Sequence, residues 1–282
     1  MPLFKYTTLD RLDILENQQI RYTQPGAFND PFEMPAFLEN LVEPDKFPDL
    51  IDGVFDNSIQ EEYEKFSPSQ KHQISFEKFY RLAAERKTAT LPLMLAALNS
   101  LAPIVRESLR DLDKLFGVLS LTETADNLLM WSHYADQHRG MVLEVDEHHE
   151  TFNEDLSTKT EERQHRPVVY SDTRPTITLH NFDFTAFFFT KSQEWAYEKE
   201  VRIIKALNGA KRTIPTKQNG YDICLFELPA SAVKRVILGA RTTRAEQERI
   251  RKTLLENAHL NHIELQQANL EDRQFKLTFT VC

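Results

Sequence analysis

Short apolar runs separated by turn-forming residues recur along the chain and predict β-strands. The clearest is Phe116 to Thr122, whose nearly continuous apolar run is typical of a buried strand. From Glu198 to Ile204, charged and apolar residues alternate, as they do in a strand that is buried on one face. Other strands are expected at 3–6, 19–23, 141–145, 168–170, 176–179, 223–228, 233–238, 263–265 and 275–281.

Helical periodicity dominates the region from residue 34 to residue 115, where Phe76, Phe79, Tyr80 and Ala83 recur at the spacing of one helix face. Prolines divide this region into short helices. Further helices are expected at 9–15, 126–139, 182–194 and 243–258. We therefore predict an α+β protein, in which a mixed, bent β-sheet is interrupted by a helical insertion at 34–115, within one compact domain that covers 1–282.

The composition excludes several function classes. The 282 residues include seven glycines, and no two of these lie within ten residues of each other. Rossmann, P-loop and nucleophile-elbow motifs each need closely spaced glycines, so these three classes are excluded. The two cysteines form no C-x-x-C pair and the histidines have no partners at ligand spacing, so we expect no metal site.

The charge balance is acidic, with 43 acidic and 34 basic residues and a net charge of −9. Such a field repels a phosphate backbone, so specific binding to duplex DNA is not expected, whereas a small nucleotide needs only a few placed cations. The first residues do not resemble a secretory signal, the cysteines make no disulfide framework, and no apolar run approaches the ~18 residues of a membrane span. We expect a cytoplasmic protein without a membrane segment.

A loop dense in turn formers, aromatic residues and acids follows the second predicted strand. Its sequence is Phe28-Asn29-Asp30-Pro31-Phe32-Glu33. Two interpretations stay open for it: a wall of a binding pocket, or an Asx turn in which Asn29 or Asp30 binds its own backbone.

The segment from Met130 to Gly140 carries a second group of candidates. On a helix, the spacing places His133 and Gln137 on one face and aligns Trp131, Tyr134 and His138 on another. A structural role is favoured for Trp131, because a tryptophan of this kind buries its ring. For His133 and Tyr134, structural and functional roles are equally open.

The strongest candidates lie between Glu194 and Arg202. Glu198, Glu200 and Arg202 alternate along the predicted strand and therefore point to one face. Neighbouring carboxylates repel each other, which would raise the pKa of one of them and suit it to acid–base or cation-stabilising work. Trp195 and Tyr197 directly precede them and favour a functional site over a solvated face of paired charges. A PD-(D/E)xK nuclease is disfavoured, because the adjacent Glu198 and Lys199 point to opposite faces.

These segments, together with Phe4-Lys5-Tyr6, resemble the bacterial domain-of-unknown-function family number 2971. The motifs that carry the resemblance are FNDPFE at 28–33, WSHYA at 131–135 and WxYExExR at 195–202. Their order and spacing cover nearly the whole chain.

The chain also bears a distant resemblance to ADP-ribosyltransferase-like domains. The strand with Lys5 and the short helix after it are similar to the start of those domains, and 120–122, the Trp131 helix and 141–145 are similar to their centre. Glu200, or Glu198, would then hold the place of their catalytic glutamate. Lys5 stands where those domains have His or Arg.

This resemblance implies an enzyme that consumes NAD as its substrate, either a transferase or an NAD glycohydrolase, with a role as a toxin or defence effector. A carboxylate would stabilise the oxocarbenium-like ribose without any metal. Catalytic residues would be Glu200, Glu198, His133 and Tyr134. Substrate-binding residues would be Lys5, Tyr6, Arg21, Phe28, Asn29, Asp30, Ser120, Trp131, Trp195 and Arg202.

The acceptor of the ADP-ribose is left open and would be water, a protein or a nucleic acid. Two other functions remain as alternatives. The first is a non-catalytic module that binds a nucleotide or another protein, and the second is a nuclease.

Overall fold

The computed structural model describes residues 2–33, 38, 40–152, 165–176, 178, 183–216 and 220–282. Contacts between residues group the chain into two compact units, whereas the sequence analysis expects one. The larger unit comprises Met1–Pro35, Asp111–Arg174 and Thr185–Cys282. The smaller unit comprises Ala36–Arg110 and Pro175–Phe184, so it contains most of the predicted helical insertion.

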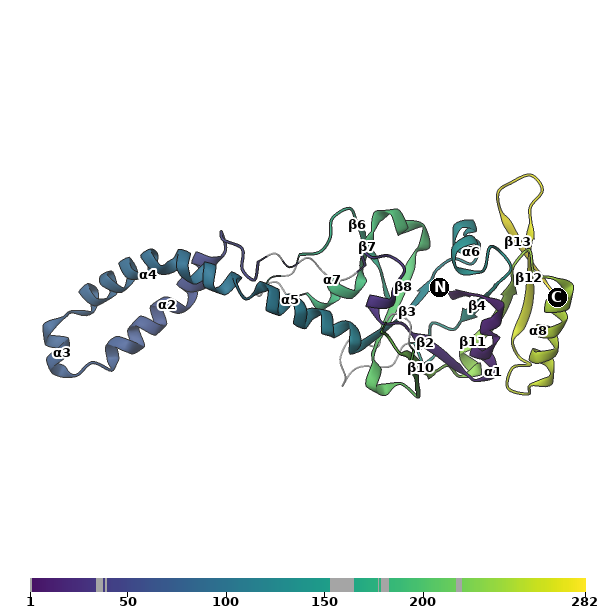
Figure 1. The fold of residues 1–282 in the computed structure, drawn as a ribbon, viewed down its shortest axis with the longest axis horizontal. Coiled ribbons are helices and arrows are strands. Elements are labelled where there is room, and N and C mark those ends of the chain that lie inside the picture. The colour runs from purple at the N-terminus through teal and green to yellow at the C-terminus, as the bar shows by residue number, and fades with distance from the viewer. Residues whose placement is uncertain are drawn as a thin grey trace. The chain divides into compact units, whose positions relative to one another are not determined.

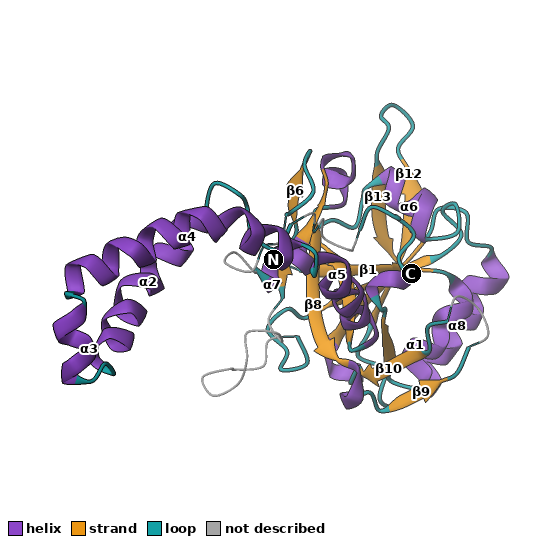
Figure 2. Ribbon diagram, turned by 60° about the vertical axis from the view of Figure 1, so that its left-hand side comes forward, coloured by secondary structure: helices purple, strands orange, loops and turns teal. Residues whose placement is uncertain are grey.

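A mixed, eight-stranded sheet forms the centre of the larger unit (Figures 1 and 2). The strand order is β13-β12-β11-β4-β1-β3-β8-β5, and all neighbours run antiparallel except β11 and β12. The predicted α+β class with a mixed sheet is confirmed. The strands are β1 (Leu3–Thr7), β3 (Phe116–Thr122), β4 (Met141–Val145), β5 (Arg166–Pro167), β8 (Glu200–Ala206), β11 (Val233–Leu238), β12 (Glu264–Leu270) and β13 (Leu277–Val281).

Two smaller sheets complete the larger unit. One has the order β2-β10-β9 and the other pairs β6 with β7. The first is tied to the main sheet by Thr23 and Val118, whose backbones exchange hydrogen bonds of 2.9 and 2.8 Å. The strands are β2 (Gln19–Tyr22), β6 (Val169–Ser171), β7 (Thr190–Ser192), β9 (Arg212–Ile214) and β10 (Ile223–Glu227).

Alternate residues of the main sheet enter two separate apolar clusters, as the period of two in a strand requires. Leu3 and Leu143 belong to one cluster and Phe4 and Val142 to the other. Helices cover both faces: α8 (Arg244–Glu256) contributes to the first cluster, and α6 (Leu128–Tyr134) contributes Trp131 to the second. Shorter helices include η1 (Leu9–Leu12), α1 (Asp13–Glu16), η2 (Pro25–Ala27), η3 (Leu112–Lys114), α7 (Phe184–Phe189), η6 (Leu207–Gly209) and η7 (Ala230–Ala232).

Strands β1 and β3 separate after one residue pair. β1 pairs with β4 over its whole length, but with β3 only where Phe4 faces Thr122. Further along, β3 pairs with Thr23 instead. The backbone carbonyl of Ser120 accepts a hydrogen bond of 2.9 Å from Lys5 Nζ, so a side chain occupies a position that a neighbouring strand would otherwise fill.

The smaller unit is helical, as predicted for the insertion. It contains α2 (Phe47–Glu64), α3 (Pro68–Gln73), α4 (Phe76–Asn99) and most of α5 (Ala102–Asp111). Ser67 and Ser75 cap α3 and α4 by accepting hydrogen bonds from backbone N–H groups. Aromatic contacts join α2 to α4, for example Phe55 to Tyr80 with ring centroids 5.7 Å apart.

Among the described residues, one helical segment is long and apolar enough to cross a membrane by length and composition. It is Phe76–Leu109, with an 18-residue window of mean hydropathy 1.5, of which 6% is buried. This window includes threonine, asparagine, serine and proline, so a search for uninterrupted apolar runs passes over it. A single helix of this kind is weak support for a membrane span, and the absence of a membrane segment stays a prediction.

Two predicted helices differ from the structure. The helix expected at 126–139 starts after Asn127, whose side chain caps it, and ends at Tyr134. The aromatic helix expected at 182–194 ends at Phe189, because β7 follows directly. Two positions of the strand expected at 176–179 lie outside the described part of the chain.

Candidate functional site

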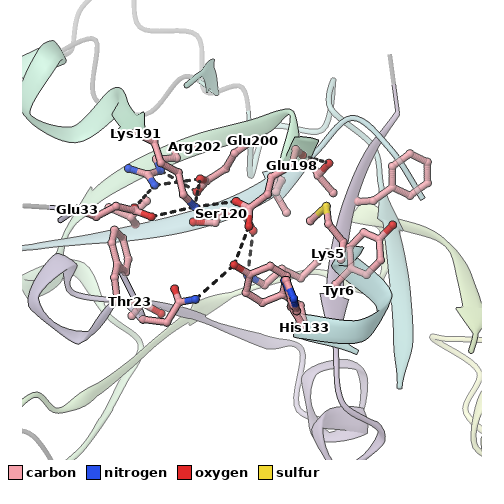
Figure 3. Close-up of a pocket in the computed structure, with 18 of the residues that line it drawn as sticks. Lys5, Tyr6, Thr23, Glu33, Ser120, His133, Lys191, Glu198, Glu200 and Arg202 are labelled. Atoms are coloured by element: carbon pink, nitrogen blue, oxygen red, sulfur yellow. Dashed lines mark hydrogen bonds and ion pairs between the residues drawn. The ribbon is translucent and has the colours of Figure 1, made fainter. Parts of the chain in front are cut away.

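A cavity of about 470 Å³ opens in the larger unit where β1 and β3 separate (Figure 3). This volume falls in the range of small-molecule sites. Its walls come from β1, β3, β8, α6, Lys191 of β7 and the loop after β2. The lining residues are Phe4, Lys5, Tyr6, Arg21, Thr23, Ala27, Phe28, Asn29, Glu33, Val118, Ser120, Leu121, Thr122, Met130, His133, Tyr134, Lys191, Glu198, Glu200 and Arg202.

Five buried charged side chains form one wall, which we name the charged cluster: Glu33, Lys191, Glu198, Glu200 and Arg202 (Figure 3). Lys191 Nζ lies 2.9, 2.7 and 3.1 Å from oxygens of Glu33, Glu198 and Glu200. The Arg202 guanidinium pairs with Glu33 and Glu200 and also donates to the backbone oxygen of Phe188 at 2.7 Å. Three carboxylates therefore face two cations, which leaves one negative charge in excess.

Glu200 is the most completely bonded carboxylate of the charged cluster. Its oxygens accept hydrogen bonds from Arg202 Nε at 2.7 Å, Arg202 Nη2 at 3.0 Å and Lys191 Nζ at 3.1 Å, and the Ser120 side chain adds a fourth. Burial alone would raise the pKa of Glu200, but Arg202 and Lys191 outweigh it and lower this pKa to about 2. Four donors use the ~4 acceptor positions of a carboxylate, so Glu200 is ionised and saturated.

Glu198 has fewer partners than Glu200. Its Oε1 accepts from the Tyr134 hydroxyl and its Oε2 from Lys191 Nζ, each at 2.7 Å. Its backbone oxygen accepts from the buried Thr122 hydroxyl at 2.5 Å, which fixes the residue against β3. Two of the ~4 acceptor positions of the Glu198 carboxylate remain for a ligand that enters the cavity.

Lys5 and Arg21 are two cavity-lining cations that have no carboxylate partner among the described residues. Lys5 donates to the Ser120 carbonyl, and the Nε atom of Arg21 is buried without a hydrogen-bond partner. Burial is the main reason why the pKa of Lys5 falls to about 8, with Arg11 and Arg21 contributing, although Glu200 opposes the shift. Burial and the charge of Arg11 also lower the pKa of Arg21. Such cations can receive an anionic ligand.

Aromatic side chains line the cavity next to these charges. Phe28 lies against the guanidinium of Arg202, 5.3 Å from ring centroid to Cζ. Burial and the neighbouring Glu198 raise the pKa of Tyr134, whose hydroxyl also accepts a long hydrogen bond of 3.4 Å from Asn29. The cavity thus combines flat apolar surfaces with a carboxylate and cations, which suits a nucleotide.

Eleven of the fourteen predicted site residues line this one cavity: Glu198, Glu200, His133, Tyr134, Lys5, Tyr6, Arg21, Phe28, Asn29, Ser120 and Arg202. The other three, Asp30, Trp131 and Trp195, do not line it. Trp131 is fully buried in the apolar cluster under α6 and donates its indole N–H to the Ala125 carbonyl at 2.8 Å. Asp30 accepts from the indole of Trp195 at 2.7 Å and from the N–H of Phe32 at 2.8 Å. Both interpretations of the loop are therefore realised, since Asp30 forms the turn while Phe28 and Asn29 face the cavity.

One expectation about the paired glutamates is wrong, and a second does not hold for Glu200. Glu198 is not part of the strand, because it ends the 3-10 helix η5 (Gln193–Glu198), and Lys199, with a φ of 43°, turns the chain into β8. Repulsion also does not raise the pKa of Glu200, which falls because the charges of Arg202 and Lys191 outweigh the effect of burial. The prediction assumed two isolated carboxylates and did not include Lys191.

Sequence reasoning about the site missed two members of the charged cluster, Glu33 and Lys191. Glu33 closes the FNDPFE motif, but its partner Arg202 is 169 residues away, and no local pattern reports that contact. Lys191 follows the aromatic run Phe187 to Phe189, and a lone lysine after such a run is a signal that it is buried with a partner.

Metal ligation is not suggested by the geometry. In the part of the chain that the structure describes, no group of three or more His, Cys, Asp or Glu is arranged to hold a metal ion. Glu198 and Glu200 face the ammonium of Lys191 instead, so the nuclease alternative gains no support from the charged cluster.

One comparison with known proteins gives a match. The family described as "Protein of unknown function (DUF2971)" matches residues 130–203, which run from α6 to β8 and include Glu198, Glu200 and Arg202. No curated protein and no solved structure matches the chain. The resemblance to ADP-ribosyltransferase-like domains therefore remains a prediction. The segment from α6 to β8 is therefore similar to the DUF2971 family.

Proposed function

We propose that the cavity binds NAD and that the protein cleaves the bond between nicotinamide and ribose, as a transferase or as an NAD glycohydrolase. The observation that carries this proposal is the distribution of charge in one cavity of about 470 Å³. Glu198 has acceptor positions left on one wall, and Lys5 and Arg21 have no carboxylate partner on another. A dinucleotide offers ribose hydroxyls to Glu198 and a pyrophosphate to Lys5 and Arg21.

Glu198 is the carboxylate that we assign to the reaction. Cleavage of the nicotinamide–ribose bond develops positive charge on the ribose, and a carboxylate held next to the ribose stabilises this charge. Tyr134 and Lys191 hold the Glu198 carboxylate in one orientation, so no reorganisation is needed during the reaction. Glu200 acts indirectly in this proposal, because it holds Lys191 and Arg202 in place.

A non-catalytic nucleotide-binding module is the second candidate, and one observation favours it. Every carboxylate of the charged cluster already contacts Lys191. This ammonium opposes the development of a second positive charge nearby. A module that binds the nucleotide without cleaving it would have the same cavity and the same cations.

The test is whether the purified protein releases nicotinamide from NAD. The reaction is run with and without cell lysate as a source of acceptor, and chromatography measures the nicotinamide. We expect release by the wild type and a loss of at least about 100-fold in Glu198→Gln. Glu194→Gln is the matched control, because Glu194 is exposed on the same 3-10 helix and lies outside the cavity.

Calorimetry with NAD separates the two candidates. Binding without release of nicotinamide would support the module and reject the enzyme. If the protein neither binds NAD nor releases nicotinamide, both proposals are rejected. Release that depends on the lysate would identify a transferase, and release in buffer alone would identify a glycohydrolase.

A further inference from the structure

His133 is an exposed residue whose ring is nevertheless held in one place at the cavity. It follows Ser132 in the last turn of α6 and lines the same cavity as Glu198. Its Nδ1 lies 3.2 Å from the Tyr197 hydroxyl. The rings of Trp195 and Tyr197 pack edge-on against it, with centroids 6.5 and 6.4 Å away. These three contacts restrain the orientation of the imidazole at the cavity.

The contact with Tyr197 leaves Nε2 available. Among the described residues, no hydrogen bond or ion pair is made by that nitrogen of His133. When Nδ1–H donates to the Tyr197 oxygen, Nε2 carries the lone pair, which is the tautomer that a general base needs. Tyr197 is thus a positioning residue for the imidazole.

Transfer to an acceptor hydroxyl requires a group that takes up the acceptor's proton. Glu200 is saturated by four donors, and Glu198 faces the ribose in the proposed reaction. Lys5, with a pKa near 8, is predominantly an ammonium ion at neutral pH and cannot accept a proton. His133 is the imidazole that lines the cavity on the described chain, and its side chain is exposed to an incoming acceptor.

We propose that His133 is the general base for the acceptor, an inference that rests on the proposed cleavage of NAD. The bond between ribose C1′ and the nicotinamide nitrogen breaks, and its electron pair leaves with neutral nicotinamide. The acceptor oxygen forms the new bond to C1′, and its proton moves to Nε2 of His133. The exposed imidazolium then returns this proton to solvent. Figure 3 shows His133 beside Lys5 and Tyr6, across the cavity from Lys191 and Arg202.

The test uses a nucleophile that has no proton to lose. With water or lysate as acceptor, His133→Gln should release nicotinamide about 100-fold more slowly than the wild type. Sodium azide should restore the variant and form a ribosyl azide, because the azide anion needs no base. Azide should increase the rate of the wild-type protein only slightly. His148→Gln is the matched control, because His148 is exposed outside the cavity.

Each result decides between the proposals. A loss in His133→Gln that azide does not repair would mean a structural role and would overturn the assignment, as would full activity of that variant. A wild-type protein that releases no nicotinamide would overturn the proposed function, and this inference with it. Tyr197→Phe should lose part of the rate in water and keep the rate with azide, which a merely structural contact would not produce.

Discussion

The charged cluster holds one more carboxylate than cations, and this excess has a consequence for each glutamate. Arg202 and Lys191 are buried, so each needs its partners to offset the cost of removing a charge from water. Glu200 serves both of them, whereas Glu198 serves Lys191 alone. Removing the charge of Glu198 would leave two carboxylates with two cations.

We therefore expect Glu200→Gln to destabilise the protein far more than Glu198→Gln. The first variant leaves Arg202 short of a partner in a buried site, at a cost of about 3 to 5 kcal/mol. The second keeps Glu33 and Glu200 on Lys191 and should cost about 1 kcal/mol. Urea unfolding followed by tryptophan fluorescence measures both free energies. Equal losses would contradict the division of roles.

Lys5 makes anion binding depend on pH. Its pKa of about 8 means that the ammonium is present below pH 8 and is lost as the pH rises above it. The affinity for ADP-ribose should therefore fall between pH 7 and pH 9. Lys5→Arg, whose guanidinium stays charged, should bind with an affinity that is independent of pH in this range. A wild-type affinity that is unchanged at pH 9 would remove Lys5 from the binding site.

At the level of elements, the turn after α6 has three consecutive residues in a strained conformation. Asp136, Gln137 and His138 have φ values of 44°, 53° and 69°, in the left-handed region. This turn brings the His138 ring into a stack on Trp131, with centroids 6.1 Å apart and an angle of 11° between the planes. Each non-glycine residue in this conformation costs about 1 to 2 kcal/mol, so the turn stores free energy next to the cavity.

Gln137→Gly should stabilise the protein by about 1 kcal/mol, because glycine adopts a positive φ without steric cost. Gln137 is exposed, and a long 3.4 Å contact from Arg139 is the side-chain hydrogen bond that the substitution removes. Urea unfolding measures the change in free energy. Gln137→Ala is the control, since it removes the same contact but keeps the strain. Equal stability of the two variants would refute the claim of strain.

Gly140, which follows the same turn, is needed for a close approach. A Cβ atom there would lie 2.3 Å from the carbonyl oxygen of Thr7 and 2.8 Å from the backbone of Ala135. Both are backbone atoms that cannot rotate away. The glycine thus lets α6 return directly into β4 beside β1, which keeps His133 and Tyr134 close to Lys5.

At the scale of the whole molecule, the two units differ in how much apolar surface they bury. In the smaller unit the described buried apolar residues are Leu38, Leu41, Val42, Phe47, Ala102 and Leu109. The main sheet of the larger unit has apolar clusters on both faces. All cavity-lining residues belong to the larger unit.

We expect the two units to unfold in separate transitions, with the helical unit first. Both tryptophans, Trp131 and Trp195, lie in the larger unit, so fluorescence reports that unit alone. Far-ultraviolet circular dichroism also reports the helices of the smaller unit. The circular dichroism signal should therefore begin to change at a lower urea concentration than the fluorescence signal. Coincident transitions would contradict this expectation.

Much of the site was predictable from the sequence, because local patterns select buried and polar positions. The alternation after Lys199 places Glu200 and Arg202 on one face of β8, and the short apolar run around Lys5 marks β1. The turn formers around Asp30 mark a loop. Each of these signals depends on residues that are close together in the chain.

Local patterns in the sequence were sufficient to predict the α+β class, the order of most elements, the helical insertion and eleven of the cavity-lining residues. Which charged side chains meet depends on the folded arrangement of the whole chain. Glu33 reaches Arg202 across 169 residues, and Lys191 enters between three carboxylates. These contacts saturate Glu200 and leave acceptor positions on Glu198. The reason is that a side chain's remaining hydrogen-bonding capacity depends on partners from distant segments, and chain folding alone brings these together.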